Sequence, residues 1–182
     1  MLKKGSPIRF VVAFIILFLL FYYFNIGFFA VTNPGKYYSR FLADHLNYIE
    51  ALRIFLLKAS AFVLKCLGHA TVINNYEMLT AGHGIIRMVY SCLGLGVMSF
   101  FLAFVIAYPK PFKQKIIFGI AGLIGIQLLN ILRFVLLSLY WNRSASQVID
   151  HHTIFNIVIY ILISITLYFW VTTDTHQKHA KN

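Results

Sequence analysis

Acidic residues are nearly missing from this 182-residue sequence. Five Asp and Glu stand against sixteen Lys and Arg, which gives a formal net charge of +11, and charged residues of both signs make up 12% of the chain. Soluble globular domains carry about 25% charged residues, so that class is excluded. Hydrophobic residues account for 60% of the chain, and the mean hydropathy is +0.77. This composition is typical of a protein that lies within a lipid bilayer.

Cysteine is also scarce, and two residues of this type do not specify an oxidising or a reducing compartment. The basic residues lie mostly between or beside apolar runs, as topology-determining charges do in membrane proteins. We therefore expect no nucleic-acid partner in spite of the charge, and we expect the lipid bilayer as the partner.

Four apolar segments are long enough to cross about 30 Å of hydrocarbon, which requires about 20 residues of helix. They are Phe10–Val31, Tyr90–Tyr108, Ile116–Leu139 and Thr153–Val171. Several Tyr and Trp residues lie near their ends, where amphipathic rings favour the membrane interface. The first segment lacks a small-residue cleavage site and exceeds a signal-peptide core, so we expect a retained anchor. The sequence predicts an all-α polytopic membrane protein with four transmembrane helices.

Basic loops predict the orientation of these helices. The loop Tyr108–Lys115 holds three Lys and no acid, so the positive-inside rule places it in the cytoplasm. Residues 141–152 then lie outside, and the C-terminal tail lies inside. Three basic residues within the first nine place the N-terminus inside as well. The long segment 32–89 is therefore predicted to be external.

The segment Ala51–Leu67 admits two interpretations. It is apolar, but it carries Lys58 and Lys65, which lie two helical turns apart on one face. This pattern favours an interfacial amphipathic helix. If the segment spans the membrane as a fifth helix, the N-terminus lies outside while every later segment keeps its side.

A small extracytoplasmic hairpin is predicted between this helix and the second span. Turn residues at 74–75 and 82–84 are flanked by Thr71–Ile73 and Ile85–Tyr90, which are rich in β-branched and apolar residues. The sequence shows no internal repeat, low-complexity tract or linker. We therefore predict that residues 1–182 form a single domain.

Arg133 is the most unusual residue within the predicted spans. It lies about six residues, on the order of 9 Å, inside the outer end of its helix, among Leu, Ile, Phe and Val. One interpretation is an arginine that extends outward to the interface. The other is a functional site, because all five carboxylates fall outside the four predicted spans and offer no counter-ion within them.

Cys92 and His152 are predicted at the same membrane face as Arg133. Cys92 has two alternative roles, as inert packing or as a disulfide partner of Cys66, but a neighbouring guanidinium favours the nucleophilic thiolate. His152 has the alternative role of an ordinary interfacial histidine, and it is also suited to accept the proton of a thiol near neutral pH. Three helices thus bring Cys92, Arg133 and His152 to similar depth, which favours a catalytic site.

Two further groups are weaker candidates. Asn130 lies one turn before Arg133 and either orients it or bridges two helices. Four histidines, among them His151, allow an external metal site, but none shows the His-x-x-x-His pairing with a carboxylate that makes zinc motifs specific. We expect no metal and no cofactor. The other three histidines of this set are His69, His83 and His152.

The order of these motifs resembles the exosortase/archaeosortase family. The resemblance covers residues 73–163 and rests on Ser91-Cys-Leu-Gly94, Asn130-Ile-Leu-Arg133 and the pair His151-His152 before Thr153. Ser91 and Leu93 replace the small residue and the Ser that are usual beside the family cysteine, and the short chain is similar to the compact bacterial branch. On this resemblance Cys92 is the nucleophile, Arg133 the invariant arginine and His152 the histidine. Asn130 and His151 are supporting candidates because of their positions beside Arg133 and His152.

The resemblance implies a multi-pass cysteine transpeptidase or protease of the cytoplasmic membrane, with its active site facing outward. Its substrates would be exported proteins that end in a short motif, a transmembrane helix and a basic tail. Cleavage would proceed through a thioacyl-enzyme on Cys92. The alternative function is a small membrane transporter or assembly subunit, in which Arg133 binds an anion or a partner helix.

Overall fold

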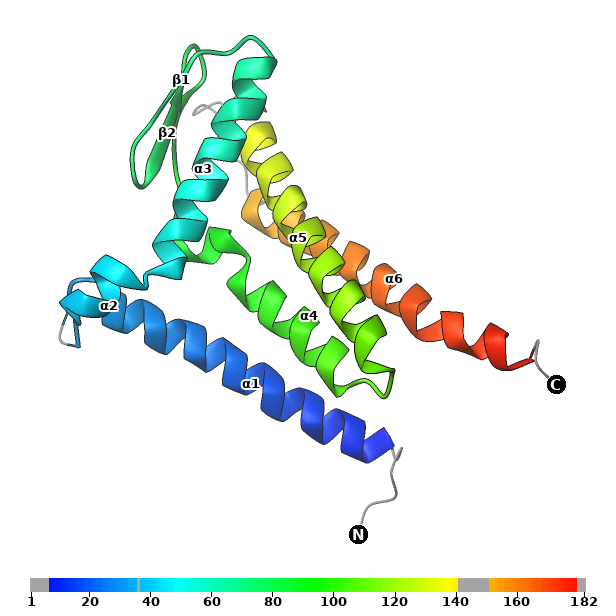
Figure 1. Ribbon diagram of the computed structural model, residues 1–182. Coiled ribbons are helices and arrows are strands. Elements are labelled where there is room, and N and C mark those ends of the chain that lie inside the picture. Colours follow the sequence, from blue (N-terminus) through cyan, green and yellow to red (C-terminus); the bar gives the residue numbers. More distant parts are fainter. Residues whose placement is uncertain (1–6, 36, 141–150, 180–182) are drawn as a thin grey trace. The chain divides into compact units, whose positions relative to one another are not determined.

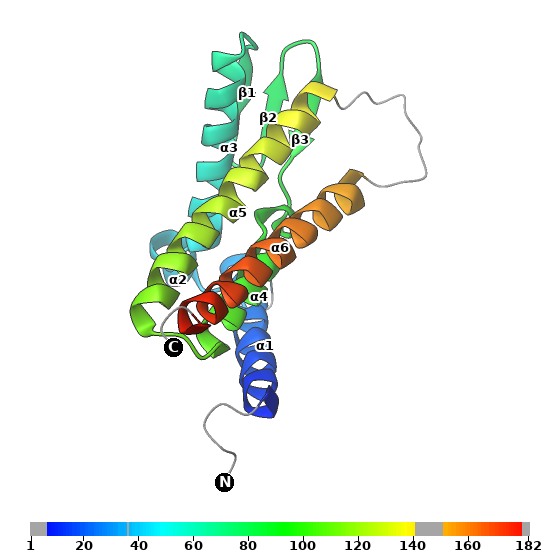
Figure 2. The same cartoon turned by 90° about the vertical axis from the view of Figure 1, so that its right-hand side faces the viewer.

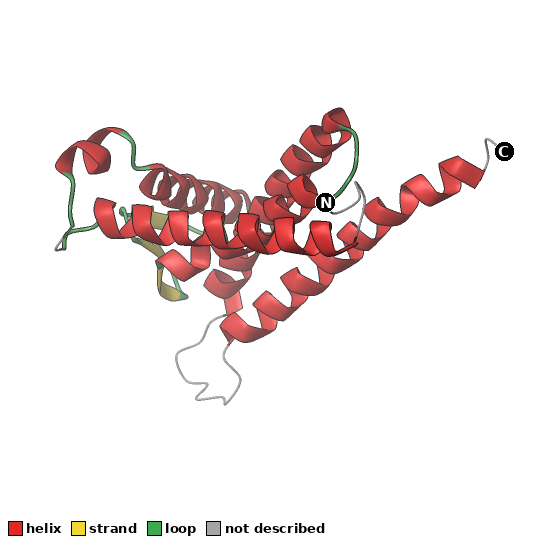
Figure 3. Cartoon of the chain, turned by 90° about the horizontal axis from the view of Figure 1, so that it is seen from below, coloured by secondary structure: helices red, strands yellow, loops and turns green. Residues whose placement is uncertain are grey.

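The computed structural model describes residues 7–35, 37–140 and 151–179, without the side chains of residues 151–154, 156 and 174–179. The chain forms two compact units, Met1–Asn142 and Arg143–Asn182. Nearly all regular structure is helical, and the exception is one small sheet in the first unit (Figure 3).

The first helix of the first unit is α1, Pro7–Thr32, which runs beside α4, Leu95–Ala107 (Figure 1). Proline is well suited to the first turn of a helix, because no intrahelical acceptor awaits its missing N–H there. Aromatic rings make the contact between the two helices. Phe10 and Phe104 pack edge to face with ring centroids 5.4 Å apart, and Phe14 packs in the same way on Phe100 at 5.3 Å.

The helix α5, Phe112–Tyr140, packs against α4 on one side and α3 on the other. Its close approach to α4 depends on Gly122, because a Cβ at that position would overlap the ring of Phe101. Among the described residues, α1 and α5 are the two helices long and apolar enough to cross a membrane.

The helix α3, Tyr48–Cys66, follows the short α2, Arg40–His45. Asn47 caps α3, since its side-chain oxygen accepts a hydrogen bond from the Glu50 N–H at 3.1 Å. The lysines that suggested an amphipathic helix, Lys58 and Lys65, are exposed. The buried stripe on α3 consists of Ile49, Arg53, Leu56, Leu57, Ser60 and Leu64.

The segment predicted as a hairpin is a three-stranded antiparallel sheet, in the order β1-β2-β3 (Figure 2). Its strands are β1, Thr71–Ile73, β2, Glu77–Thr80, and β3, Gly84–Arg87. The extra strand β2 lies between the two predicted turns, where buried Met78 and Thr80 alternate with exposed Leu79. The hydroxyls of Thr80 and Ser138 are hydrogen-bonded to each other, which joins the sheet to the end of α5.

The second predicted span was wrong at its start. Residues Tyr90–Leu93 form a 3-10 helix, η1, and α4 begins only at Leu95. The break falls at Gly94, whose φ of 71° is in the left-handed region that glycine adopts without strain. The α-helix therefore has 13 residues, about 20 Å of length at 1.5 Å per residue. Cys92 lies in the turn before this helix rather than one turn inside it.

The core of the first unit lies where α3, the sheet, η1 and α5 meet. It includes Leu57 of α3, Met78 of β2, Cys92 and Leu93 of η1, and Phe134 of α5. The 3-10 helix η1, the cysteine turn that carries Cys92, therefore shares its core with elements that are distant in the sequence.

The second unit contains the helix α6, His151–His179, which is longer at both ends than the predicted span Thr153–Val171. Its apolar part is Ile157–Thr173. The hydroxyls of Ser164 and Thr166 donate to carbonyls one turn earlier, at 2.8 Å each. This local bonding lets polar side chains occur on an apolar helix without an outside partner.

Candidate active site

The candidate nucleophile Cys92 lies in the short turn η1. Its backbone N–H donates to the Val89 carbonyl at 2.9 Å, and its side chain is 3% exposed. Gly94, in the left-handed conformation, then ends η1 and caps α4, which begins with Leu95. The turn thus holds Cys92 outside regular α-helix, at the junction of the sheet-bearing segment and α4.

The side chain of Asn130 fastens this turn to α5. Its Nδ2 donates to the Leu93 carbonyl at 3.3 Å and to Gln127 Oε1 at 3.1 Å, and the residue is 1% exposed. A Cβ on Gly94 would lie 2.6 Å from the same Nδ2. Only glycine lets the Asn130 amide approach the backbone this closely. Asn130 therefore bridges α5 and η1, one of the two roles predicted for it.

Gln127 extends this polar bridge to α4. Its Nε2 donates to the Leu93 carbonyl at 3.5 Å and contacts Met98 Sδ at 2.7 Å. Gln127 was not predicted from the sequence as a site residue. The available signal was its position three residues before Asn130, on the same face of an otherwise apolar helix.

Arg133 lies three residues beyond Asn130 on α5 and is 2% exposed. It is among the largest fully buried side chains of the described residues. Such burial does not fit an arginine that extends to the interface, because snorkelling keeps the charged group in water. Its neighbours Phe134 and Val135 belong to the apolar core that also contains Cys92. The helix carrying Arg133 and the cysteine turn therefore share one core.

The histidine candidates lie on α6, in the other unit. His151 is the first residue of α6 and His152 is the second. Their side chains lie outside the described residues, so the predicted roles of both histidines stay predictions.

The sequence allowed two other arrangements, a disulfide between Cys66 and Cys92 and a metal site formed by histidines. Cys66 and Cys92 are not joined in a disulfide, and Cys66 is exposed at the end of α3, so the disulfide alternative was wrong. The rings of His69 and His83 pack edge to face with centroids 5.1 Å apart. Within the described side chains, no group of three or more metal-binding residues gathers around them.

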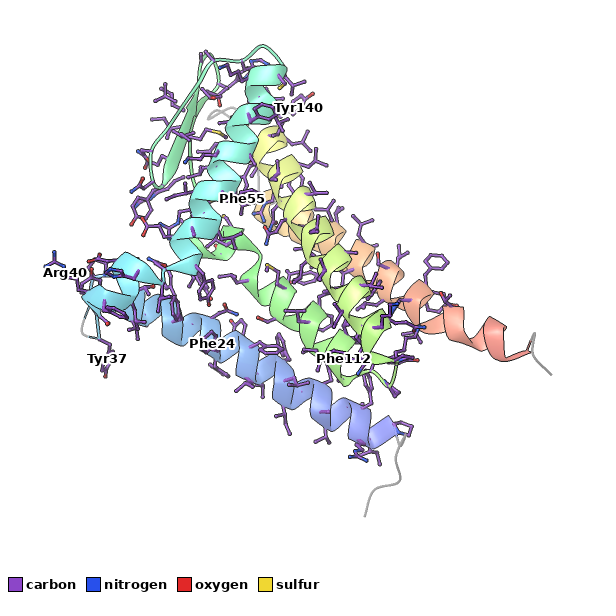
Figure 4. All side chains as sticks on the ribbon, in the orientation of Figure 1. Phe24, Tyr37, Arg40, Phe55, Phe112 and Tyr140 are labelled. Carbon is purple, nitrogen blue, oxygen red and sulfur yellow. The ribbon has the colours of Figure 1, made fainter. Side chains whose placement is uncertain are left out.

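An apolar cavity of about 610 Å³ opens between α1, α3 and α4. Phe24 of α1 and Phe55 of α3, both labelled in Figure 4, lie on its walls. Its α4 wall begins with Leu95, which directly follows Gly94. The cavity therefore lies next to the cysteine turn.

A second buried arginine, Arg53, was not predicted from the sequence either. It is 4% exposed on the inner face of α3, and its guanidinium lies over the Tyr76 ring, 4.4 Å from the ring centroid. The signal was its spacing, since Arg53 falls on the same stripe as Ile49 and Leu57. The two lysines that suggested an amphipathic helix, Lys58 and Lys65, lie on the opposite, exposed face.

Comparison with known protein families assigns the chain to one of them. Residues 3–169 match the model of the transmembrane exosortase family. The chain belongs to this family. The resemblance seen in three short motifs is thereby confirmed, and it extends over most of the chain rather than residues 73–163 alone. No curated protein and no solved structure matches the chain.

Membership in this family indicates the general activity of the protein. Exosortases are membrane-embedded cysteine transpeptidases or proteases that process the sorting signals of exported proteins. The bilayer is accordingly the environment of this exosortase, in agreement with its apolar helices.

Proposed function

We propose that this exosortase cleaves C-terminal sorting signals at the outer face of the cytoplasmic membrane, through a thioacyl-enzyme on Cys92. The observation that carries the proposal is the hydrogen bond from Asn130 to the Leu93 carbonyl. It ties the cysteine turn to the helix of Arg133, and residues of both belong to one apolar core. Fixed polar groups in an apolar setting are what electrostatic catalysis requires.

The first half of the reaction acylates the enzyme. His152 accepts the Sγ proton of Cys92, and the thiolate attacks the carbonyl carbon of the scissile peptide bond. Arg133 stabilises the thiolate and then the tetrahedral oxyanion. The C–N bond breaks, the leaving amine takes the proton from His152, and the N-terminal part of the substrate stays on sulfur as a thioester.

The second half restores the thiol. An acceptor with an N–H or O–H group attacks the thioester carbonyl, His152 takes its proton, and the C–S bond breaks. The proton then returns to sulfur. An amine, lipid or glycan acceptor gives transpeptidation, whereas water gives proteolysis.

The exosortase is proposed to cross the membrane several times, with the Cys92 turn at the outer face and the loop before α5 in the cytoplasm. The three Lys near Tyr108–Lys115 support this orientation. The substrate helix would lie in the bilayer beside the spans and present its motif to Cys92.

The test compares membrane proteins from cells that carry Cys92→Ser, Cys66→Ser or the unchanged enzyme. We expect Cys92→Ser cells to accumulate precursors that retain an apolar helix and a basic tail, detected by mass spectrometry of C-terminal peptides. Cys66→Ser is the matched control and should process normally, since that thiol is exposed and away from the core. The unchanged enzyme should form a substrate adduct that hydroxylamine releases, as a thioester requires.

Full processing by Cys92→Ser would refute the cysteine mechanism. The transporter or assembly alternative, in which Arg133 binds an anion or a partner helix, would then be the better account of the buried charge.

A further inference from the structure

Arg53 is a buried charge whose opposite-sign partner is missing from the described part of the chain. It is 4% exposed, and its Nε has no hydrogen-bond acceptor among the described residues. A buried guanidinium without an acceptor lowers the stability of the folded protein, and an acceptor supplied by a ligand would offset this cost.

The carboxylates whose side chains are described are all engaged elsewhere. Asp44 pairs with Arg40 at 3.4 Å, and Glu77 pairs with Arg87 at 4.0 Å. Glu50 accepts a hydrogen bond from Asn47 at 3.1 Å. None of these three carboxylates therefore pairs with Arg53.

Tyr76 holds the Arg53 guanidinium by one face only. The ring centroid lies 4.4 Å from Cζ, which is a cation–π contact. Stacking on the face does not use the in-plane N–H groups, and the buried Nε has no hydrogen-bond partner among the described residues. Nε with one Nη forms a parallel pair of donors that fits the two oxygens of a carboxylate.

Arg53 and Cys92 are connected through short contacts. The Tyr76 carbonyl accepts a hydrogen bond from the Met88 N–H at 2.7 Å, and the next residue, Val89, accepts from the Cys92 N–H at 2.9 Å. The flanking residues of Arg53 on α3, Ile49 and Leu57, belong to the core that contains Cys92. Arg53 is thus flanked on α3 by residues of the core that contains the proposed nucleophile.

We infer that Arg53 is a substrate-positioning residue that binds a carboxylate in the substrate segment beside the cleaved bond. The inference rests on the proposed function and names the chemistry by which that site selects its substrate. The exposed fraction of Arg53 is 4%, which favours a single acidic side chain over the broad phosphate surface of a membrane. Arg53 touches no reacting atom and acts on binding.

The experiment uses the precursor that accumulates in Cys92→Ser cells as its probe. Acidic residues before its apolar helix are changed singly, Asp to Asn and Glu to Gln, and each precursor is processed by membranes that contain the unchanged enzyme. One such change should raise the precursor level for half-maximal processing at least tenfold, with the maximal rate kept. Arg53→Gln should cause the same shift with the unchanged precursor, and the two changes together should cause no more than either alone.

Arg87→Gln is the matched control, because that arginine is exposed on β3 and should leave the half-maximal level unchanged. If Arg53→Gln does not accumulate in membranes, Arg53→Lys replaces it. A shift by Arg53→Lys that disappears with the acid-to-amide precursor supports the inference, and an equal shift with both precursors overturns it.

If none of the acid-to-amide changes in the precursor segment before the apolar helix alters processing, the role of Arg53 is refuted, even if Cys92→Ser abolishes processing. Normal processing by Cys92→Ser would instead defeat the proposed function itself. The two failures are therefore distinguishable.

Discussion

Single residues carry the unusual features of this exosortase, and they are polar groups in an apolar core. Asn130, Arg133 and Ser138 are buried along one face of α5, and Arg53 and Ser60 are buried on α3. Each of these groups loses water on burial, so each requires a partner or costs stability. They lie on the two helices that pack around the cysteine turn, which is where the proposed function places the active site.

Arg133→Ala is expected to lower precursor processing by about 100-fold or more, which is the typical effect of removing a group that stabilises an oxyanion. The amount of enzyme in membranes should change much less. Arg133→Lys keeps the charge but not the planar fork and should retain part of the activity. Processing rates measured in membranes, divided by enzyme amount, check the prediction. Arg87→Ala should behave as the unchanged enzyme does, and equal activity for Arg133→Ala would contradict the proposed role.

Asn130→Ala is expected to lower stability by about 1–3 kcal/mol, because it leaves the buried Leu93 carbonyl without its Asn130 donor. Processing should fall as well, since the cysteine turn loses its tie to α5. Thermal unfolding in detergent and processing in membranes check both effects. The control is Gln114→Ala, at an exposed position on the same helix. Unchanged processing by a folded Asn130→Ala enzyme would show that the bridge is dispensable.

Gly94→Ala is expected to lower stability through backbone strain and through a clash with Asn130, whereas Gly68→Ala introduces the strain alone. At Gly94 the positive φ of 71° strains any other L-residue, and the new Cβ would also lie 2.6 Å from Asn130 Nδ2. Gly68 has a φ of 87°, and a Cβ added there would meet nothing within 4 Å. Gly68→Ala should therefore cost about 1–2 kcal/mol of strain alone, and Gly94→Ala should cost more and reduce processing. Equal unfolding temperatures for the two variants would argue against the close contact with Asn130.

At the scale of elements, the pairing of α4 with α5 determines how the cysteine turn meets Arg133. The loop that joins them is short, and the helices come together at Gly122 under the ring of Phe101. Small residues permit such approaches between membrane helices, where van der Waals contact replaces the hydrophobic effect as the attraction. A change at this contact should therefore displace η1 relative to α5.

Gly122→Ala is expected to destabilise the enzyme by about 1–3 kcal/mol through overpacking against Phe101. Gly125→Ala is the control, because a Cβ there meets nothing within 4 Å. Combining Gly122→Ala with Phe101→Leu should recover part of the loss, since the smaller side chain leaves room. Thermal unfolding in detergent measures all three, and an absence of recovery would place the strain elsewhere.

For the whole molecule, orientation in the membrane decides which side meets the substrate. Cysteine-free protein with one new cysteine at position 74, 113 or 40 reports the side of each loop to a membrane-impermeant thiol reagent in intact cells. Asn74→Cys should react and Lys113→Cys should react only after lysis. Arg40→Cys should react from outside if α3 lies at the interface, and only after lysis if α3 spans. Reaction of Lys113→Cys in intact cells would reverse the proposed topology.

The sequence by itself determined the membrane class, the family and the main helices, because long apolar runs and short motifs are local properties of the chain. It also singled out Cys92 and Arg133 as a thiol and a charge that an apolar setting does not explain. Tertiary structure decided what joins them. The bridge from Asn130 and Gln127 to the Leu93 carbonyl and the stacking of Arg53 on Tyr76 both arise between segments distant in sequence. A hydropathy value does not predict such contacts, since it measures how apolar a segment is and not which polar atoms are hydrogen-bonded to each other.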